Sequence, residues 1–318
     1  MRTFFLLTTL FVLVTMIGLA IWTRHNLAAI AAEHPPTGVV SAASAGSLNY
    51  RYHPLGNSID GGDEPAPVLF VHGASGNLLD QYHAFAPVLK NKRSILFVDR
   101  PGHGFSPRLE AETPAEHANR YAKLLDSLSI DKVILVGHSL GSASVAAFGV
   151  LHPDRVQGLV FLAPATHPWP TGVDWYYTVA STPILDFIFT ETVALPVGLS
   201  RVESGVVNVF DPNPVAENYV KNSAIKLIFR PEAFRANSRD VAGLNEFVLQ
   251  FSKRYKEIKA PTVIITGDKD DVVAPSIHSI GLERDIEGAE LIVLPNVGHK
   301  PDYAATETVL KAIETVSK

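Results

Sequence analysis

The sequence predicts an α/β protein in which helices cover both faces of a mostly parallel sheet. Short apolar runs rich in Val, Ile, Leu and Phe alternate with segments of helical pattern along most of the chain. Runs of this kind are typical of strands buried on both faces of a parallel sheet. The alternation breaks between about residues 166 and 258, where aromatic residues and prolines replace the β-branched runs. We therefore expect a helical cap inserted between two strands of one sheet.

Composition allows a large core and excludes several functions. The chain has 318 residues, of which 47% are hydrophobic, and a formal net charge of −5. This charge gives no basic surface for nucleic acid. The chain has no cysteine, which excludes disulfides and thiolate chemistry, and its twelve histidines show no H-E-x-x-H spacing. We expect no metal, no cofactor and no nucleic-acid partner.

The N-terminus predicts a membrane helix. No charged residue lies between Thr3 and Thr23, and the apolar run Phe4–Trp22 would cover roughly 30 Å as a helix. We expect residues 1–25 to be a single transmembrane anchor, with the amino end inside and the catalytic domain exported. Residues 26–45, rich in Ala, Pro and Ser, would then form a linker.

A cleaved signal peptide is the alternative, with Ala29-Ile30-Ala31 as its processing site. The protein would then be secreted or periplasmic. The apolar run is long for a signal peptide, and Arg24 and His25 follow it where a neutral stretch would be expected. These two observations favour the anchor.

The first half of the remaining domain, 46–318, contains four expected strands. They cover Leu48–His53, Val68–Val71, Ser94–Val98 and Lys132–Val136, with a Gly- and Pro-rich loop at 57–67.

Two helix starts in this half carry sequence signals. Asn77 with Asp80 predicts a cap for the helix after the second strand. Thr113, Pro114 and Glu116 form a capping box with proline at the first helical position, so a second helix begins there.

The second half contains three more runs. Val156–Leu162 precedes the cap, while Pro261–Thr266 and Glu290–Leu294 follow it, and a closing helix begins near Asp302. The cap aromatics are expected either to form the cap's own core or to line a substrate pocket.

The pentapeptide Gly137-His138-Ser139-Leu140-Gly141 lies between a buried strand and a small-residue helix. Strand, Gly-x-Ser-x-Gly and helix together predict a nucleophile elbow. A turn sharp enough to lift Ser139 above the sheet leaves no room for side chains at the two glycine positions.

Ser139 needs a base, and the base needs an acid that orients it. His299 directly follows the last expected strand, and Asp270 follows the strand before it. Because ligand sites of parallel sheets lie at the carboxyl ends of the strands, all three residues should lie on one edge. Asp268 and Asp271 also follow that strand, so the identity of the acid stays open on position alone.

From about residue 46 to the end, the chain resembles the α/β-hydrolase fold. It carries five motifs in the order expected of that family: His72-Gly73, the Asp99–Ser106 loop, the elbow, the acid after the sixth expected strand and the terminal Gly298-His299. The resemblance implies about eight strands and selects Asp270 over Asp271. It also implies an oxyanion hole made by the N–H groups of Ala74 and Leu140.

The resemblance and the triad together predict a serine hydrolase that cleaves an ester of a hydrophobic or lipid-like substrate. Cofactor-free perhydrolase activity and carbon–carbon bond hydrolysis remain alternatives on the same residues. A ligand-binding homologue without turnover is a third alternative, because a fold does not decide a function.

Overall fold

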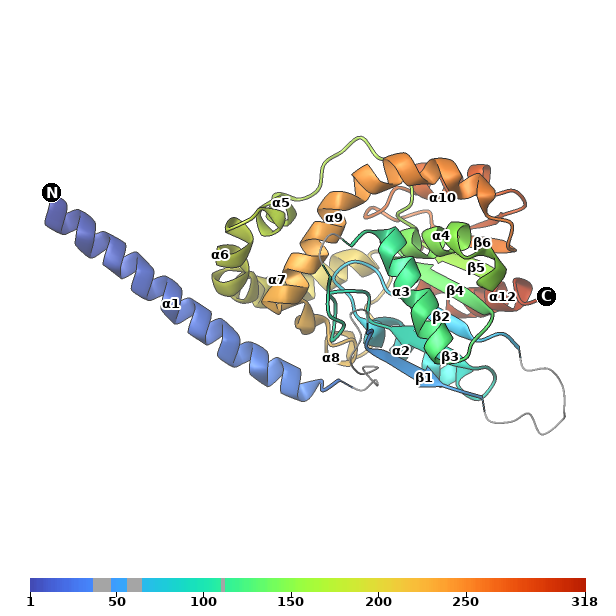
Figure 1. The fold of residues 1–318 in the computed structure, drawn as a ribbon, viewed down its shortest axis with the longest axis horizontal. Helices are drawn as coiled ribbons and strands as arrows, with labels where there is room; N and C mark the ends of the chain where they lie inside the picture. The colour runs from blue at the N-terminus through green and yellow to red at the C-terminus, as the bar shows by residue number, and fades with distance from the viewer. Residues whose placement is uncertain (37–46, 56–64, 110–111) are drawn as a thin grey trace.

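The structure is a computed structural model that describes residues 1–36, 47–55, 65–109 and 112–318 (Figure 1). Most of the expected loop at 57–67, and residues 37–45 of the expected linker, lie outside the described residues.

The described residues form one seven-stranded sheet, and every apolar run identified in the sequence is one of its strands. The sheet order is β1-β3-β2-β4-β5-β6-β7; β1 is antiparallel to β3, and all other neighbours are parallel. About eight strands were expected from the family resemblance, but no further run in the sequence corresponded to the eighth. The strands are β1 Tyr50–His53, β2 Val68–Val71, β3 Ile95–Val98, β4 Val133–His138, β5 Val156–Leu162, β6 Thr262–Gly267 and β7 Glu290–Leu294.

Each face of the sheet carries its own hydrophobic core. Alternate residues of β2 and β3 point to opposite faces: Leu69 and Leu96 belong to one core, Phe70 and Phe97 to the other. Helices α3 (Pro114–Ser127), α4 (Gly141–Leu151) and α10 (Pro275–Asp285) contribute to the first core, while α2 (Leu78–Leu89) and α12 (Thr306–Thr315) contribute to the second. This two-sided cover confirms the predicted α/β architecture.

Both predicted helix starts are confirmed. The side chain of Asn77 accepts a hydrogen bond from the Leu79 N–H at 2.9 Å and caps α2. Glu116 closes the capping box of α3 by accepting from the N–H of Thr113 at 2.8 Å.

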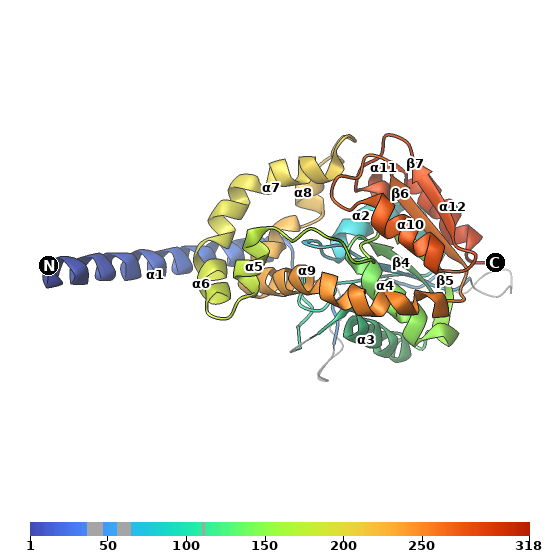
Figure 2. The same ribbon diagram turned by 90° about the horizontal axis from the view of Figure 1, so that it is seen from above.

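Only helices and turns occur between β5 and β6 in the described part of the chain. They form the cap, which lies at the end of the molecule nearest to α1 (Figure 2). The cap helices are α5 Trp175–Ser181, α6 Leu185–Thr192, α7 Ala194–Phe210, α8 Tyr219–Asn222 and α9 Pro231–Phe251. A 3-10 turn follows α8 at Ile225–Phe229, and another follows α9 at Ser252–Glu257.

Helix α1 (Arg2–Glu33) is longer than the predicted anchor. Residues 26–33 were expected in the linker but continue the helix, because Leu27 and four alanines in this stretch are strong helix formers. None of the most apolar 18-residue window of α1 is buried, whereas Leu27 packs against Leu195, Ile228 and Phe229 of the cap. The helix is long and apolar enough to span a membrane, as a signal sequence would also be.

Candidate active site

Ser139 lies at the sharp turn between β4 and α4. Its φ of +51° falls in the left-handed region that L-residues rarely adopt. A Cβ at Gly137 would lie 2.9 Å from the Ser142 Cα, and one at Gly141 would lie 2.4 Å from the His72 carbonyl oxygen. The steric reason for both glycines, inferred from the sequence, therefore holds in the structure.

The edge of the sheet brings Ser139, His299 and Asp270 together. His299 Nε2 lies 2.9 Å from the Ser139 Oγ, and His299 Nδ1 lies 2.8 Å from the Asp270 Oδ2. All three side chains are buried, with relative exposures of 4 to 6%. A hydroxyl, an imidazole and a carboxylate in this chain of hydrogen bonds can move a proton from the hydroxyl to the imidazole.

Asp270, rather than Asp271, faces the histidine. Its second oxygen, Oδ1, accepts hydrogen bonds from the N–H groups of Val272 and Val273, both at 2.9 Å. These bonds orient the carboxylate. Asp271 is exposed, and Asp268 instead accepts from the Asn296 N–H at 2.7 Å.

Ala74 and Leu140 lie beside Ser139, after β2 and at the start of α4. Within the described residues, neither N–H donates a hydrogen bond to the protein. Leu140 immediately precedes α4, whose amino end carries partial positive charge. The two N–H groups are therefore free to bind an anionic oxygen near Ser139.

A polar contact from the cap holds the Ala74 loop in place. Asn237 of α9 accepts from the Ser75 N–H at 2.7 Å, and Ser75 has a φ of +58°. Asn237 also lies 3.3 Å from the His103 Nε2. The sequence carried no signal for Asn237, because it lies more than 160 positions after the loop that it supports.

Buried side chains of the two motif turns, His72-Gly73 and Asp99–Ser106, brace these loops. His72 accepts from the Arg100 N–H at 2.9 Å, and His103 Nδ1 lies 3.1 Å from the Pro101 carbonyl oxygen. Burial lowers the pKa of His72 well below its ordinary value and that of His103 to about 3. Asp99 accepts from the N–H groups of Leu78 and Phe105, while burial raises its pKa to about 6.

An apolar cluster contains Leu140 and contacts Ala74. Leu140 packs with Leu244 and Val248 of α9, and Trp169 contacts the same cluster. Trp169 therefore packs in an apolar cluster formed by α9 and by residues next to Ser139. Trp175 and Phe187 fit neither role considered for the cap aromatics, since they are 69% and 57% exposed.

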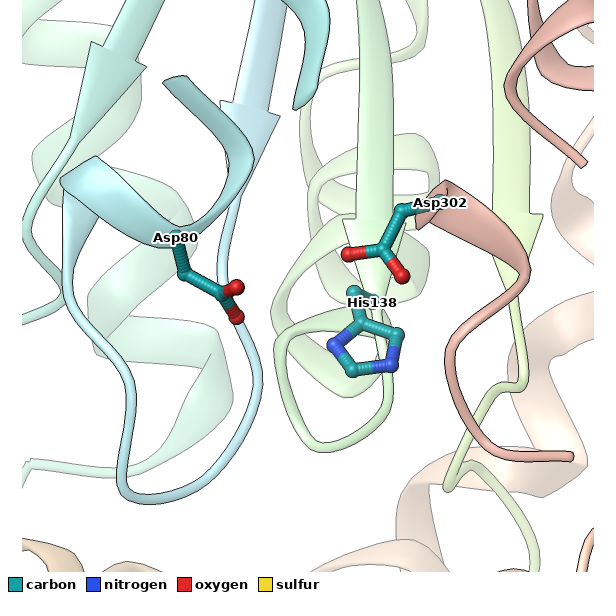
Figure 3. Close-up of side chains that lie close together, drawn as sticks. All are labelled: Asp80, His138 and Asp302. Carbon is teal, nitrogen blue, oxygen red and sulfur yellow. The ribbon is translucent and has the colours of Figure 1, made fainter. Parts of the chain in front are cut away.

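A buried ionic cluster lies behind the catalytic edge, and we call it the Lys300 cluster: Lys300, Asp80, Asp302 and His138. Figure 3 shows Asp80 on α2, His138 at the end of β4 and Asp302 on α11 (Pro301–Ala304). Their ligand atoms lie within 4.8 Å of one another, a spacing suited to a metal ion. Lys300 Nζ, however, lies 2.9 Å from an oxygen of each carboxylate. The ammonium group supplies the positive charge that a metal would bring.

The surroundings of Lys300 fit this interpretation. Its Nζ lies 5.2 to 6.0 Å from the ring centres of Phe210, Tyr219 and Tyr303, within reach of cation–π attraction. Despite the opposing effect of burial, the two carboxylates raise the pKa of Lys300. Burial and the Lys300 charge lower the pKa of His138, whose Nε2 lies 2.9 Å from the His299 carbonyl oxygen. The cluster therefore ties the His299 loop to α2, α11 and the cap.

Comparison with known proteins agrees with this architecture. A sequence profile of the alpha/beta hydrolase fold matches residues 66–301, most of the chain. The chain belongs to the alpha/beta hydrolase fold family. This hydrolase is 24% identical over 84% of its length to a 2-hydroxy-6-oxononadienedioate/2-hydroxy-6-oxononatrienedioate hydrolase of Comamonas testosteroni, of which 91% is covered.

Two further relatives show the range of the family. A sn-1-specific diacylglycerol lipase of Mus musculus is 24% identical to this hydrolase over 83% of the chain, with 86% of the lipase covered. The solved enol-lactonase of Burkholderia xenovorans LB400 superposes with a TM-score of 0.68 at 18% identity, covering 86% of this chain and 98% of its own. The relatives in sequence thus include a lipase and a hydrolase of a dienedioate, and the solved enol-lactonase shares the fold.

Proposed function

We propose that the protein is a serine hydrolase that cleaves an ester of a hydrophobic, lipid-like substrate through an acyl-enzyme. The observation that supports this most directly is the continuous chain of hydrogen bonds from Ser139 through His299 to Asp270. In the proposed reaction the Ser139 Oγ attacks the ester carbonyl carbon while His299 Nε2 takes the hydroxyl proton. Asp270 holds the imidazole and stabilises the positive charge that it gains.

The remaining steps follow from the same groups. The N–H groups of Ala74 and Leu140 would bind the oxyanion of the tetrahedral intermediate, a contribution of roughly 3 to 4 kcal/mol for a single donor. His299 then returns its proton to the departing alcohol, which leaves Ser139 acylated. A water molecule, deprotonated by His299, attacks the acyl carbon, and the Ser139 hydroxyl is regenerated as the acid leaves.

The apolar cluster beside Leu140 supports a hydrophobic acyl or alcohol group. Leu244, Val248 and Trp169 would contact such a group on the cap side of Ser139. For the location, we propose that α1 anchors the chain in a membrane, with the catalytic domain exported. Its apolar window is exposed, whereas Leu27 and Ile30 near its carboxyl end pack against the cap.

The test of the mechanism is Ser139→Ala, which should lower turnover of an aryl ester by about 10⁴-fold or more because the nucleophile is lost. The matched control is Ser144→Ala, which removes another buried serine hydroxyl from the same strand–turn–helix unit. Labelling by a fluorophosphonate should disappear in the first variant and persist in the second. Unchanged turnover by Ser139→Ala would contradict the mechanism, and a wild-type protein that resists the label would favour a binding protein without turnover.

Carbon–carbon bond hydrolysis is the second candidate, favoured by the Comamonas testosteroni relative that aligns with most of the chain. Purified protein should be offered aryl esters of graded acyl length and a 2-hydroxy-6-oxo-dienoate in parallel. Preference for the dienoate by kcat/KM would replace the ester hydrolase proposal. The anchor is tested separately: full-length protein should stay with membranes through an alkaline wash, whereas a soluble chain beginning near Ala32 would indicate a cleaved signal peptide.

A further inference from the structure

Helix α6 buries four of its polar residues and exposes three of its four large apolar residues, Phe189 being partly buried. Its buried members are Asp186, Thr190, Glu191 and Thr192, all at most 8% exposed. Leu185, Phe187 and Ile188 are instead 48, 57 and 39% exposed. A helix on a water-facing surface normally shows the opposite pattern, so the surroundings of α6 are expected to be apolar.

The two carboxylates of α6 are neutralised within the protein. Asp186 Oδ2 lies 2.9 Å from the Arg239 Nη2 of α9, and Glu191 accepts two hydrogen bonds from Arg24 of α1 at 3.0 and 3.1 Å. Charge that would oppose contact with an apolar phase is thereby paired on the inner side of the helix.

The exposed apolar residues continue beyond α6. Trp175 of α5 is 69% exposed, and Ile184, which precedes α6, is 77% exposed. We call the five residues Trp175, Ile184, Leu185, Phe187 and Ile188 the cap face. No Lys or Arg occurs between Arg155 and Arg201, the segment that carries the cap face.

The cap face lies next to the free part of α1. In Figures 1 and 2 the amino-terminal half of α1 projects past the body, and α5 and α6 form the end of the body that it passes. Thr23 is the first residue of α1 that is buried, and Arg24 joins α1 to Glu191 at the end of α6. An apolar span that ends near Trp22 would therefore leave the bilayer at the level of α6.

We propose that the cap face is a membrane-docking surface that enters the same bilayer leaflet from which α1 emerges. This inference rests on the anchor proposed above. A bilayer is favoured over a second copy of the chain because α1 itself requires one at this position. Trp175 suits the interface, where amphipathic aromatic rings collect, and the Ile, Leu and Phe side chains suit the acyl region below it. Docking would bring the cap, and the apolar cluster beside Ser139, to the phase that holds a lipid-like ester.

Because the chain has no cysteine, a single introduced cysteine reports one site. Full-length Phe187→Cys, Ile280→Cys and Phe11→Cys should each carry a nitroxide spin label in phosphatidylcholine vesicles. Ile280 of α10 is 50% exposed and serves as the matched control, while Phe11 lies within the proposed span. The ratio of collisions with oxygen to collisions with a water-soluble nickel chelate should be at least about threefold higher at position 187 than at 280, and should approach that at 11.

Each result decides one point. A ratio at 187 equal to that at 280 overturns the docking surface, and protection of 187 from both oxygen and nickel overturns it in favour of a protein contact. An aqueous ratio at position 11 overturns the anchor together with the surface. Ester hydrolysis is tested independently by Ser139→Ala, so failure of the chemistry is distinguishable from failure of docking.

A second measurement uses function. Phe187→Glu should lower hydrolysis of a long-chain ester presented in vesicles by about tenfold, because a charge enters the docking face, and should leave a short soluble aryl ester unaffected. Ile280→Glu should change neither rate. Equal loss on both substrates, or no loss on either, contradicts membrane docking.

Discussion

Helices α4 and α6 are both rich in apolar residues, yet they use them in opposite ways. In α4, every residue from Gly141 to Val150 is buried between the sheet and its neighbours. In α6, the buried side chains are polar, and three large apolar ones lie outside. Apolar character in a sequence therefore does not by itself place a residue in the core, because the rest of the structure decides which apolar residues are covered.

Truncating one phenylalanine of the buried core and one of the cap face gives the largest contrast. Phe161 of β5 is 0% exposed and Phe187 of α6 is 57% exposed. Phe161→Ala should lower the free energy of unfolding by about 4 kcal/mol, since it leaves a cavity in the core. Phe187→Ala should change it by less than about 0.5 kcal/mol. Urea unfolding of both variants in mild detergent measures the difference, and similar losses would mean that the cap face is part of the core.

The Lys300 cluster lies between the sheet domain and the cap, and it allows a buried ion pair to be compared with an exposed one. Lys300→Met should cost about 3 kcal/mol, because Asp80 and Asp302 would be left buried without their cation. The control is Lys259→Met, which breaks the exposed pair with Glu287 and should cost less than about 1 kcal/mol. Thermal unfolding followed by circular dichroism compares the two. Equal costs would show that the cluster contributes no more than a surface pair.

The smallest of the three effects is a pH dependence of stability that arises from His103 and His117. Burial lowers the pKa of His103 and of His117 to about 3. The unfolded chain takes up these protons near pH 6.5 and the folded chain near pH 3. The contribution of each neutral histidine to stability is therefore present above about pH 6.5 and is lost as the pH falls from 6.5 toward 3. Well inside this range the free energy of unfolding falls by about 1.4 kcal/mol per histidine for each pH unit.

The variant His117→Gln should reduce this loss by about 1 kcal/mol between pH 6.5 and 5.5, which urea midpoints at the two pH values measure. Neither ring nitrogen of His117 has a hydrogen-bond partner in the described structure, so the substitution breaks no hydrogen bond seen there. An unchanged pH slope would show that His117 is protonated in the folded protein at pH 5.5.

The sheet and the geometry at its edge were predictable because their signals are local. Each strand is one apolar run, and His299 and Asp270 each follow such a run directly. The choice between Asp270 and Asp271 was not available from position, since one residue reverses the direction of a side chain. Their burial and hydrogen bonds separate them in the structure.

The features that the sequence did not predict depend on distant residues. The Lys300 cluster joins Asp80 to a lysine 220 positions later, and Asn237 supports a loop 162 positions before it. No local pattern encodes such a pair. The cap face was missed for a related reason: its aromatics were expected either in the cap's own core or along a substrate pocket, and only their exposure in the folded chain shows otherwise. The end of α1 was set too early because a linker was inferred from small residues that also favour helix.

The unbroken course of α1 has a mechanical consequence. The same rigid rod that carries the apolar run also packs Leu27 into the cap and joins Arg24 to Glu191. A helix whose apolar length differs from the thickness of its bilayer responds by tilting. With no flexible joint between the run and the cap contact, a tilt of the rod would be transmitted as torque to α6. If α1 spans a bilayer, as proposed above, the thickness of that bilayer would thereby act on the cap.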